Sequence, residues 1–301
     1  MSKIVIFGAS GFVGQNIARG LSKSGHEIIA ADISESKFEK IEKITYITND
    51  ILDSKNVDKI IEGAEVVIHL ATSTLRTSLK DPKLNIKINV GGMMNILESC
   101  RHFGVKKVIY SSASSIYGIP EYLPVDESHP KYPTTVYGIG KYSGEHLLRV
   151  YQQLYGLNYF VLRFTNVFGP YQHPDTGGLI PVVLSKILNG DNVTIFGDGS
   201  QTRDFVYVGD IVEMVKMIIP DDHKNMIVNA GSGTNTSILE AVMKCGEVLD
   251  IQPKIEYKEQ EGGERKGFQA DMSLNQKLFG DSFRTSFESG LLSTSEWIKD
   301  L

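Results

Sequence analysis

Cysteine is scarce in this chain of 301 residues, which contains only Cys100 and Cys245. The two lie far apart and outside any CxxC or Cys/His spacing, so neither a disulfide framework nor a zinc site is expected, and we predict no metal. We interpret both as core residues of a protein from a reducing compartment. This interpretation predicts a cytoplasmic protein.

Long hydrophobic runs are also missing. The apolar run Ile4–Phe7 ends at a glycine and is too short for a signal peptide, and no other run reaches the roughly eighteen residues of a membrane-spanning helix. Positive charge is not in surplus either, because the formal net charge is −5 and no block of lysine or arginine stands out. Membrane and nucleic-acid partners are therefore not expected.

What is present is an ordinary globular composition with a regular alternation in the first third of the chain. Because parallel strands need a connection of about a helix's length, this alternation predicts a doubly wound α/β fold, a Rossmann-like parallel sheet with helices on both faces. The predicted strands are Ile4–Phe7, Glu27–Ala31, Ile44–Thr48, Glu65–Leu70 and Lys107–Ser111, and the predicted helices are Phe12–Ser24, Val57–Glu62 and Ile86–His102.

A glycine-rich loop joins the first predicted strand to the first predicted helix. Its spacing, GxxGxxG over residues 8–14, is weak by itself, but at this position glycines permit a tight turn and a close approach of a pyrophosphate to free helix amides. The alternative is a turn that only packs the sheet. We expect a dinucleotide to be bound by Gly8, Ser10, Gly11, Phe12, Val13 and Gly14.

An acidic residue, Asp32, ends the second predicted strand eighteen residues after Gly14. At this place a carboxylate binds the adenosine ribose and repels a 2′-phosphate, and no arginine follows in the next loop. The sequence therefore predicts NAD rather than NADP. The alternative is that Asp32 only caps a turn.

After about residue 165 glycine and proline become frequent and the alternation turns irregular, which predicts a smaller irregular α/β lobe. We expect residues 1–165 to form the NAD-binding domain, with 205–230 returning to it, and 166–204 with 231–301 to form the substrate lobe. In that lobe a hairpin of Val193–Phe196 and Asp204–Val208 is predicted, followed by a helix over Ile238–Leu249.

Tyr137 and Lys141 form the chain's YxxxK sequence, which occurs about as often as chance predicts. Helical spacing places them one turn apart, so the ammonium is expected to lower the pKa of the phenol and make it a base for a substrate alcohol. Two unrelated surface residues are the alternative.

Several ordered motifs together resemble the NAD-dependent epimerase/dehydratase family of extended short-chain dehydrogenases, closest to the UDP-glucose 4-epimerase group. The resemblance implies a nucleotide-sugar substrate, a UDP-hexose, and a homodimer built on 89–102 and 144–155. The motifs are the loop 8–14, Asp50-Ile51, His69-Leu70-Ala71, Asn89, Ser111–Gly118, Tyr137–Lys141, Arg163–Pro170, Arg203–Val208, Ala270-Asp271 and Ser289–Leu291.

The resemblance also implies roles for single residues. Tyr137 is the expected base, and Lys141 is expected to hold Tyr137 and the nicotinamide ribose. The further cofactor residues that it implies are Ile33, Asp50, Ile51, Leu70, Ala71, Thr72, Asn89, Ser111, Phe164 and Asn166. The substrate residues that it implies are Ser112, Asn166, Leu179, Arg203 and Arg265. Core packing, turns and a surface ion pair are the alternatives for many of them.

The chain departs from the family at two places. Ala113 stands where relatives carry the Ser or Thr that bonds the reacting hydroxyl, so we expect Ser111 or Ser115 to replace it by strand alternation, or Ser112 or Ser114 if the strand ends there. Ser114-Ser115 replaces the Asp-Glu of dehydratases, which disfavours elimination. Glu261 stands where relatives carry an arginine for the diphosphate, which leaves the nucleotide open.

The sequence is therefore interpreted as an NAD-dependent nucleotide-sugar epimerase that works through a transient 4-keto sugar. Two alternatives stay open: a nucleotide-sugar reductase or dehydrogenase that exchanges its cofactor, and a catalytically weak NAD-binding sensor or scaffold.

Overall fold

The computed structural model describes residues 2–35, 40–220, 223–259, 267–281 and 283–301. The chain forms two compact units. The first contains residues 1–119, 130–164 and 212–228, and the second contains 120–129, 165–211 and 229–301. Of the segment 205–230, residues 212–228 lie in the first unit, whereas 205–211 and 229–230 lie in the second, where the strand at 205–207 pairs.

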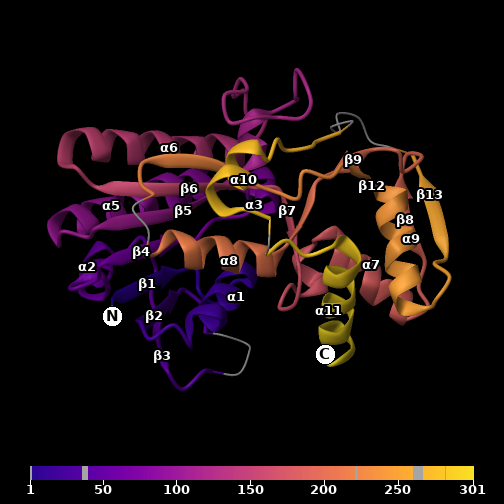
Figure 1. Ribbon diagram of the computed structural model, residues 1–301, viewed down its shortest axis with the longest axis horizontal. Coiled ribbons are helices and arrows are strands. Elements are labelled where there is room, and N and C mark those ends of the chain that lie inside the picture. Colours follow the sequence, from indigo (N-terminus) through magenta and orange to yellow (C-terminus); the bar gives the residue numbers. More distant parts are fainter. Residues whose placement is uncertain (1, 36–39, 221–222, 260–266, 282) are drawn as a thin grey trace. The chain divides into compact units, whose positions relative to one another are not determined.

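A seven-stranded sheet forms the centre of the first unit (Figure 1), and it confirms the predicted doubly wound fold. The strand order is β11-β6-β5-β4-β1-β2-β3, with β1 to β6 parallel. The strands are β1 (Lys3–Phe7), β2 (Glu27–Asp32), β3 (Ile44–Thr48), β4 (Val66–His69), β5 (Lys107–Ala113), β6 (Asn158–Phe164) and β11 (Met226–Ala230). The order reverses between β1 and β4, and in such sheets ligands bind at this switch point, beyond the carboxyl ends of the strands.

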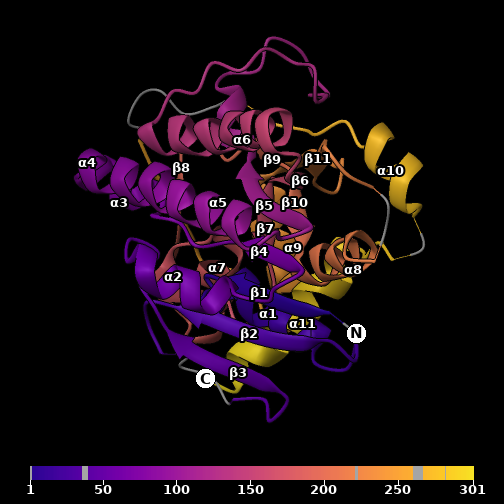
Figure 2. The same cartoon turned by 90° about the vertical axis from the view of Figure 1, so that its left-hand side faces the viewer.

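Helices cover both faces of this sheet (Figure 2). On one face lie α2 (Ser54–Ile61), α5 (Met93–His102) and α6 (Val136–Tyr155), whose apolar residues pack on alternate strand residues such as Val5 and Phe7. On the other lie α1 (Phe12–Leu21) and α8 (Val208–Ile218), which meet where Gly20 contacts Val212. None of the helices that the structure describes is long and apolar enough to traverse a bilayer.

The predicted helix at 86–102 is divided. It consists of the end of α4 (Pro82–Ile86), a π-helix η1 (Lys87–Gly92) and α5. The other short helices of the first unit are α3 (Leu75–Lys80) and the 3₁₀ helix η2 (Ser114–Tyr117). A π-helical insertion is rare and often lies at a functional site.

The second unit holds three two-stranded sheets around its own apolar core. They pair β7 (Asn166–Phe168) with β10 (Phe205–Tyr207), β9 (Thr202–Arg203) with β12 (Thr236–Ser237), and β8 (Val193–Phe196) with β13 (Ile255–Lys258). The helices are η3 (Pro174–Thr176), α7 (Leu179–Leu188), α9 (Ile238–Leu249), α10 (Ser273–Phe279) and α11 (Phe287–Lys299).

The predicted hairpin of 193–196 and 204–208 is wrong. A turn with positive φ at Gly197 and Gly199 does follow β8, but the chain then enters β9, and β8 and β10 take parallel partners from distant parts of the sequence. Local turn residues predicted the turn and could not predict the partners. The predicted helix at Ile238–Leu249 is confirmed.

Gly144 on α6 tests how closely this helix must approach the sheet. A Cβ atom at Gly144 would lie 2.5 Å from the hydroxyl and 2.7 Å from Cζ of buried Tyr110. We expect Gly144→Ala to lower the free energy of unfolding by about 1–3 kcal/mol, the usual cost of overpacking. Urea unfolding measures this. The control is Gly91→Ala, whose Cβ would meet a single described atom within 4 Å, in Leu52 at 4.0 Å. Equal stability of the two variants would contradict the prediction.

Candidate functional site

The glycine-rich loop lies at the switch point of the sheet. Gly8 has a φ of +85°, and a Cβ atom there would lie 2.5 Å from the Ala71 nitrogen, so the segments that follow β1 and β4 are in contact. A Cβ atom at Gly14 would lie 2.1 Å from the Gly8 carbonyl oxygen, so the first turn of α1 packs directly on the loop. The structure thus brings Gly8, Gly14, Leu70 and Ala71 together as expected.

Gly11 differs from these two glycines because its Cβ side is open. An added Cβ atom would meet one described atom within 4 Å, the Gly8 carbonyl oxygen at 3.3 Å. Gly11 is the N-cap of α1, no described side chain caps its amides, and the first turn carries no acidic residue. Free amides at a positive helix end attract an anion, so the loop with Phe12 and Val13 fits the diphosphate of a dinucleotide.

Asp32 ties the end of β2 to this loop. Its carboxylate accepts hydrogen bonds from the amides of Ser10 at 2.9 Å and Ser34 at 3.0 Å, and the Ser10 hydroxyl donates to the Ser34 carbonyl at 2.8 Å. Asp32 therefore does cap a turn, and it stands beside the glycine-rich loop while doing so. The next residue, Ile33, is 64% exposed and therefore accessible to a ligand.

Two of the other expected cofactor residues have structural contacts of their own. The Asp50 carboxylate accepts the Leu52 amide at 2.9 Å, as a turn residue does. Ile51 is 7% exposed and packs against Gly92, so it is a core residue.

Asn89 lies in the π-helix η1 and is buried. Its side-chain oxygen accepts the Ser73 amide at 2.7 Å and the Thr72 hydroxyl at 3.1 Å, and its amide group donates to the Ser73 carbonyl at 3.0 Å and to Asn85 at 3.2 Å. These bonds use all the polar groups of the side chain. Asn89 therefore supports the segment of Thr72, and a Cβ atom at Gly140 of α6 would lie 3.0 Å from it.

Tyr137 and Lys141 lie in the first two turns of α6, which the Thr135 hydroxyl caps by accepting the Gly138 amide at 3.1 Å. Lys141 is 2% exposed, and its ammonium donates to the Ser111 carbonyl at 2.8 Å, with the Ser111 hydroxyl at 3.4 Å. The ammonium lies 5.9 Å from the centre of the Tyr137 ring. The structure therefore groups Tyr137, Lys141 and Ser111.

Burial dominates the electrostatics of this group. It lowers the pKa of Lys141 from 10.5 to about 7 and raises the pKa of Tyr137 to about 12. The expectation that Lys141 lowers the pKa of the phenol is not met, because the ammonium is bonded to Ser111 and the loss of hydration outweighs its charge. A neighbouring histidine, His69 on β4, is kept neutral because burial and Lys141 lower its pKa to about 3.

The residue at which β5 ends decides how the serines around Ala113 are placed. The strand ends at Ala113 and η2 begins at Ser114, so the extended conformation that would carry Ser115 to the side of Ala113 is not present. Ser112 points to the opposite face from Ser111, and its hydroxyl is buried without a partner among the described residues. Ser111 is therefore the serine that lies next to Lys141.

In the second unit, Asn166 and Arg203 are held by the segment at Asp204. The Asn166 amide and side chain donate to the Asp204 carbonyl at 3.0 and 3.1 Å, and the Arg203 guanidinium donates to the Thr202 carbonyl at 2.9 Å. The buried Asp204 carboxylate accepts the amides of Ser232 at 2.7 Å and Gly233 at 3.0 Å. Sequence reasoning did not assign Asp204 a role.

The remaining expected residues add little to this site. Leu179 is the first residue of α7 and is half-buried, and Phe164 ends β6 in the first unit, also half-buried. Arg265 lies outside the described residues, as does Glu261.

The model of the NAD dependent epimerase/dehydratase family matches residues 4–231. The chain belongs to this family. Among its relatives is a putative UDP-glucose 4-epimerase of Methanocaldococcus jannaschii, 35% identical over 99% of this chain and 98% of that protein. The family resemblance, the enzyme class and NAD as cofactor are confirmed.

Two solved structures of related epimerases are similar over the whole chain. The UDP-glucose 4-epimerase of Thermotoga maritima with UDP-glucose has a TM-score of 0.94 at 30% identity, covering 99% of both chains. The UDP-N-acetylglucosamine 4-epimerase of Methanobrevibacter ruminantium with UDP-N-acetylmuramic acid has a TM-score of 0.92 at 30% identity, covering 99% of this chain and 98% of that chain. The interpretation of this chain as a nucleotide-sugar epimerase agrees with both.

Two substitutions of Asp32 separate the effect of its charge from the effect of its hydrogen bonds to Ser10 and Ser34. We expect Asp32→Asn to keep an acceptor for the Ser10 amide and to reduce discrimination against NADP, since the like-charge repulsion is gone. Asp32→Ala should in addition lower the free energy of unfolding by about 1 kcal/mol. Calorimetric titration with NAD and NADP, together with urea unfolding, measures both effects. Equal affinity of the unmutated protein for NAD and NADP would contradict this role.

The buried ammonium of Lys141 should lower the free energy of unfolding of the protein. Its pKa is lower in the folded than in the unfolded protein, so the unfavourable contribution is complete below pH 7 and fades as the pH rises toward 10.5. We expect Lys141→Met to raise the free energy of unfolding by about 1–3 kcal/mol at low pH, with a smaller gain at higher pH. Urea unfolding of nucleotide-free protein at pH values on either side of neutrality tests this, and a pH-independent difference would refute it.

Proposed function

We propose that this enzyme is a UDP-hexose 4-epimerase that works through a transient 4-keto sugar. The observation that carries the proposal is the grouping of Tyr137, Lys141 and Ser111 in the unit that also contains the open glycine-rich loop. An acid-base group can take the proton of an alcohol while a nicotinamide dinucleotide, when bound, would accept the hydride from its carbon. The UDP-sugar epimerases among its relatives support the nucleotide.

The chain's own residues move the proton. Tyr137 takes the proton of the 4-hydroxyl while the hydride leaves the carbon that bears it. After the keto sugar has turned, the hydride returns to the opposite face of that carbon and Tyr137 returns the proton to its oxygen. Bound NAD supplies the hydride acceptor and, in its oxidised form, a positive charge that favours the phenolate. Lys141 adds its ammonium and holds the end of β5, and the Ser111 hydroxyl is assigned the place of the one that Ala113 lacks. For this role it would need to turn from the His69 carbonyl, to which it donates at 3.3 Å, toward the substrate.

The substrate diphosphate is assigned to Asn166 and Arg203. Asn166 is fixed by two bonds to the Asp204 carbonyl, and a guanidinium binds phosphate oxygens with two parallel donors. Leu179, Ser112 and Arg265 complete the substrate residues of the proposal. The Ser112 hydroxyl would need to become accessible for this role, because it is buried.

A second candidate function is a NAD-binding protein with little or no turnover, which one observation favours. Ala113 removes the hydroxyl that would bond the reacting oxygen, and a missing donor in the transition state raises the barrier. A dehydrogenase that exchanges its cofactor with solvent is the third. The three differ in cofactor retention and in turnover.

Tyr137→Phe tests the proposal, because it removes the phenol hydroxyl and keeps the ring. We expect the purified protein to retain NAD and to interconvert UDP-glucose and UDP-galactose, and the variant to lose about two to four orders of magnitude in kcat with nucleotide binding intact. Turnover is measured by chromatography of the sugars, and cofactor by mass spectrometry of the denatured protein.

The matched control is Tyr155→Phe, at the exposed end of the same helix, which should keep full activity. Activity of Tyr137→Phe would require another base. Bound NAD without turnover on any UDP-hexose would favour the sensor, and activity only with added cofactor would favour the dehydrogenase.

We also propose that the enzyme is a homodimer through the face formed by η1 and α6. A groove of about 360 Å³ there is lined by apolar side chains that include Val90, Ile139, Leu147 and Val150. Further along α6, Leu154 is 66% exposed. Exposed apolar side chains in a row are characteristic of a surface that a second copy covers.

Val150→Asp should place an uncompensated charge in this interface and convert the dimer to a monomer. Sedimentation velocity of both proteins measures the state. Leu292→Asp is the control, since Leu292 on α11 is about equally exposed, at 47% against 45% for Val150. A monomeric parent protein, or a dimeric Val150→Asp variant, would contradict the assignment.

The cytoplasm is the proposed location. Both cysteines are free and buried, and burial raises the pKa of Cys245 to about 12, so neither thiol is prepared for oxidation. A structure that uses no disulfide among its described residues suits a reducing compartment.

A further inference from the structure

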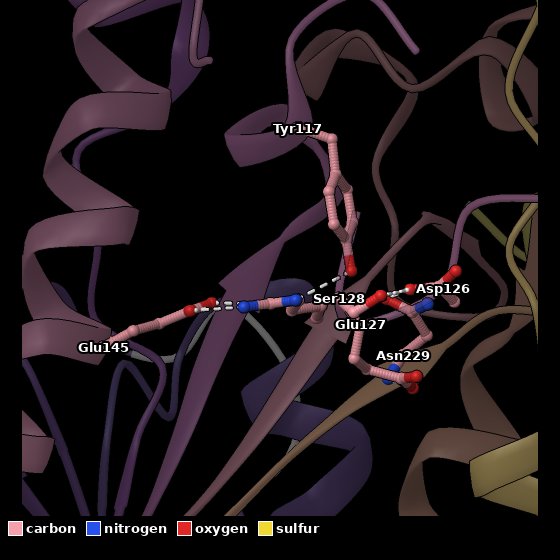
Figure 3. A network of polar contacts seen from close by, with 7 residues as sticks. Tyr117, Asp126, Glu127, Ser128, Glu145 and Asn229 are labelled. Carbon is pink, nitrogen blue, oxygen red and sulfur yellow. Dashed lines mark hydrogen bonds and ion pairs between the residues drawn. The ribbon is translucent and has the colours of Figure 1, made fainter. Parts of the chain in front are cut away.

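A buried ion pair in the first unit has no part in the chemistry described so far. Arg163 near the end of β6 and Glu145 on α6 are both about 2% exposed at their side chains. The guanidinium donates two parallel hydrogen bonds to the Glu145 carboxylate, at 2.9 and 2.7 Å. A third donor bonds the Tyr117 hydroxyl at 2.8 Å. Figure 3 shows Glu145 and Tyr117 on different sides of the guanidinium that joins them.

The three residues come from segments that also carry the Tyr137–Lys141–Ser111 group. Glu145 follows Lys141 by one helical turn and lies on the same face of α6. Tyr117 ends η2, the turn that follows β5 and therefore Ser111. Arg163 pairs in register with Ser112, the neighbour of Ser111 on β5. A single guanidinium thus connects α6, η2 and the end of the sheet.

A second contact closes this connection on the side of Tyr137. A Cβ atom at Gly138 would lie 2.8 Å from the Ser115 carbonyl oxygen, so the first turn of α6 rests directly on η2. The residue before Gly138 is Tyr137. η2 is therefore held at its middle by α6 and at its end by Arg163, and Arg163 in turn is held by α6 through Glu145. Movement of any one segment changes the place of the phenol.

Stability alone does not account for this arrangement. A buried ion pair can often be replaced by apolar residues with no loss of stability, because desolvation offsets the attraction between the charges. A planar guanidinium with two parallel bonds, by contrast, fixes the orientation of its partner as an apolar contact does not. The ion pair therefore matters for the orientation of the segments that it joins rather than for stability.

We propose that Arg163, Glu145 and Tyr117 form a positioning cluster that sets the distance between η2 and the catalytic turn of α6, and so the place of Tyr137 and Lys141. The inference rests on the proposed function, in which Tyr137 exchanges a proton with the substrate. None of the three residues touches the reacting atoms. Their loss therefore affects the chemical step rather than the binding of ligands.

Tyr117→Phe is the test, because it deletes one hydroxyl and leaves the ring and the ion pair in place. We expect kcat for UDP-hexose epimerisation to fall about ten- to a hundred-fold, the usual effect of a small misplacement of reacting groups. KM, the calorimetric affinity for the UDP-sugar and the amount of NAD retained should be unchanged. Glu145→Gln, which removes the carboxylate charge of the pair, should lower kcat further than Tyr117→Phe does. Glu145→Asp, which keeps the charge, should have a kcat above that of Glu145→Gln and below that of the parent.

Tyr151→Phe is the matched control on the same helix. Tyr151 is buried near the end of α6, away from the first turns that carry Tyr137 and Lys141. Its hydroxyl donates a hydrogen bond to the Glu98 carboxylate on α5. It should keep the parent kcat while losing a comparable hydrogen bond. Equal losses of kcat in Tyr117→Phe and Tyr151→Phe would overturn the proposal, as would parent kcat in Tyr117→Phe or a joint loss of turnover and UDP-sugar affinity.

Tyr137→Phe separates this proposal from the proposed function. If Tyr137→Phe is inactive and Tyr117→Phe keeps the parent kcat, the positioning cluster is refuted and the function stands. If Tyr137→Phe is active, another residue is the base, and the positioning cluster fails because there is no base at Tyr137 to position, while the epimerase activity stands. The proposed function fails if the parent protein turns over no UDP-hexose.

Discussion

The close approach of α6 to η2, η1 and β5 is the constraint on which the catalytic group depends. Three glycines on this helix permit it: Gly138 rests on the Ser115 carbonyl, Gly140 on Asn89, and Gly144 on the Tyr110 ring. A side chain at any of these positions would push the helix outward. Because the backbone comes so near, the long side chain of Lys141 can reach the end of β5 from within the packed layer.

That approach also determines the electrostatics. Lys141, Glu145 and Arg163 are all buried beneath α6, beside the half-buried Tyr137, in a region in which charge is costly. The buried Lys141 accordingly has its pKa lowered to about 7. Burial also acts to lower the pKa of Arg163, but its bonds to the Glu145 carboxylate outweigh that effect and raise this pKa. The site therefore combines Lys141, whose pKa lies near neutrality, with the buried Arg163–Glu145 ion pair.

Much of the fold and part of the site were predictable from local patterns. The parallel strands follow from short β-branched runs, and the place of Gly8, Gly14 and Asp32 follows from a loop whose function depends on neighbours in sequence. The hairpin at 193–208 failed for the opposite reason, since strand partners in the second unit are distant in sequence. Alternation could not place Ser115, because the change from strand to 3₁₀ helix at Ser114 ends the alternation.

By itself the sequence determined the doubly wound sheet, the glycine-rich loop, the acidic residue after β2 and the family, because each depends on residue types at short or ordered spacings. Only the tertiary structure decided which serine lies beside Lys141, and only it showed that the side chain of Asn89 is hydrogen-bonded to Ser73 and Thr72. It alone joined Arg163 to Glu145. The physical reason is burial, which sets both the pKa values and the hydrogen-bond partners, and burial depends on how distant segments pack.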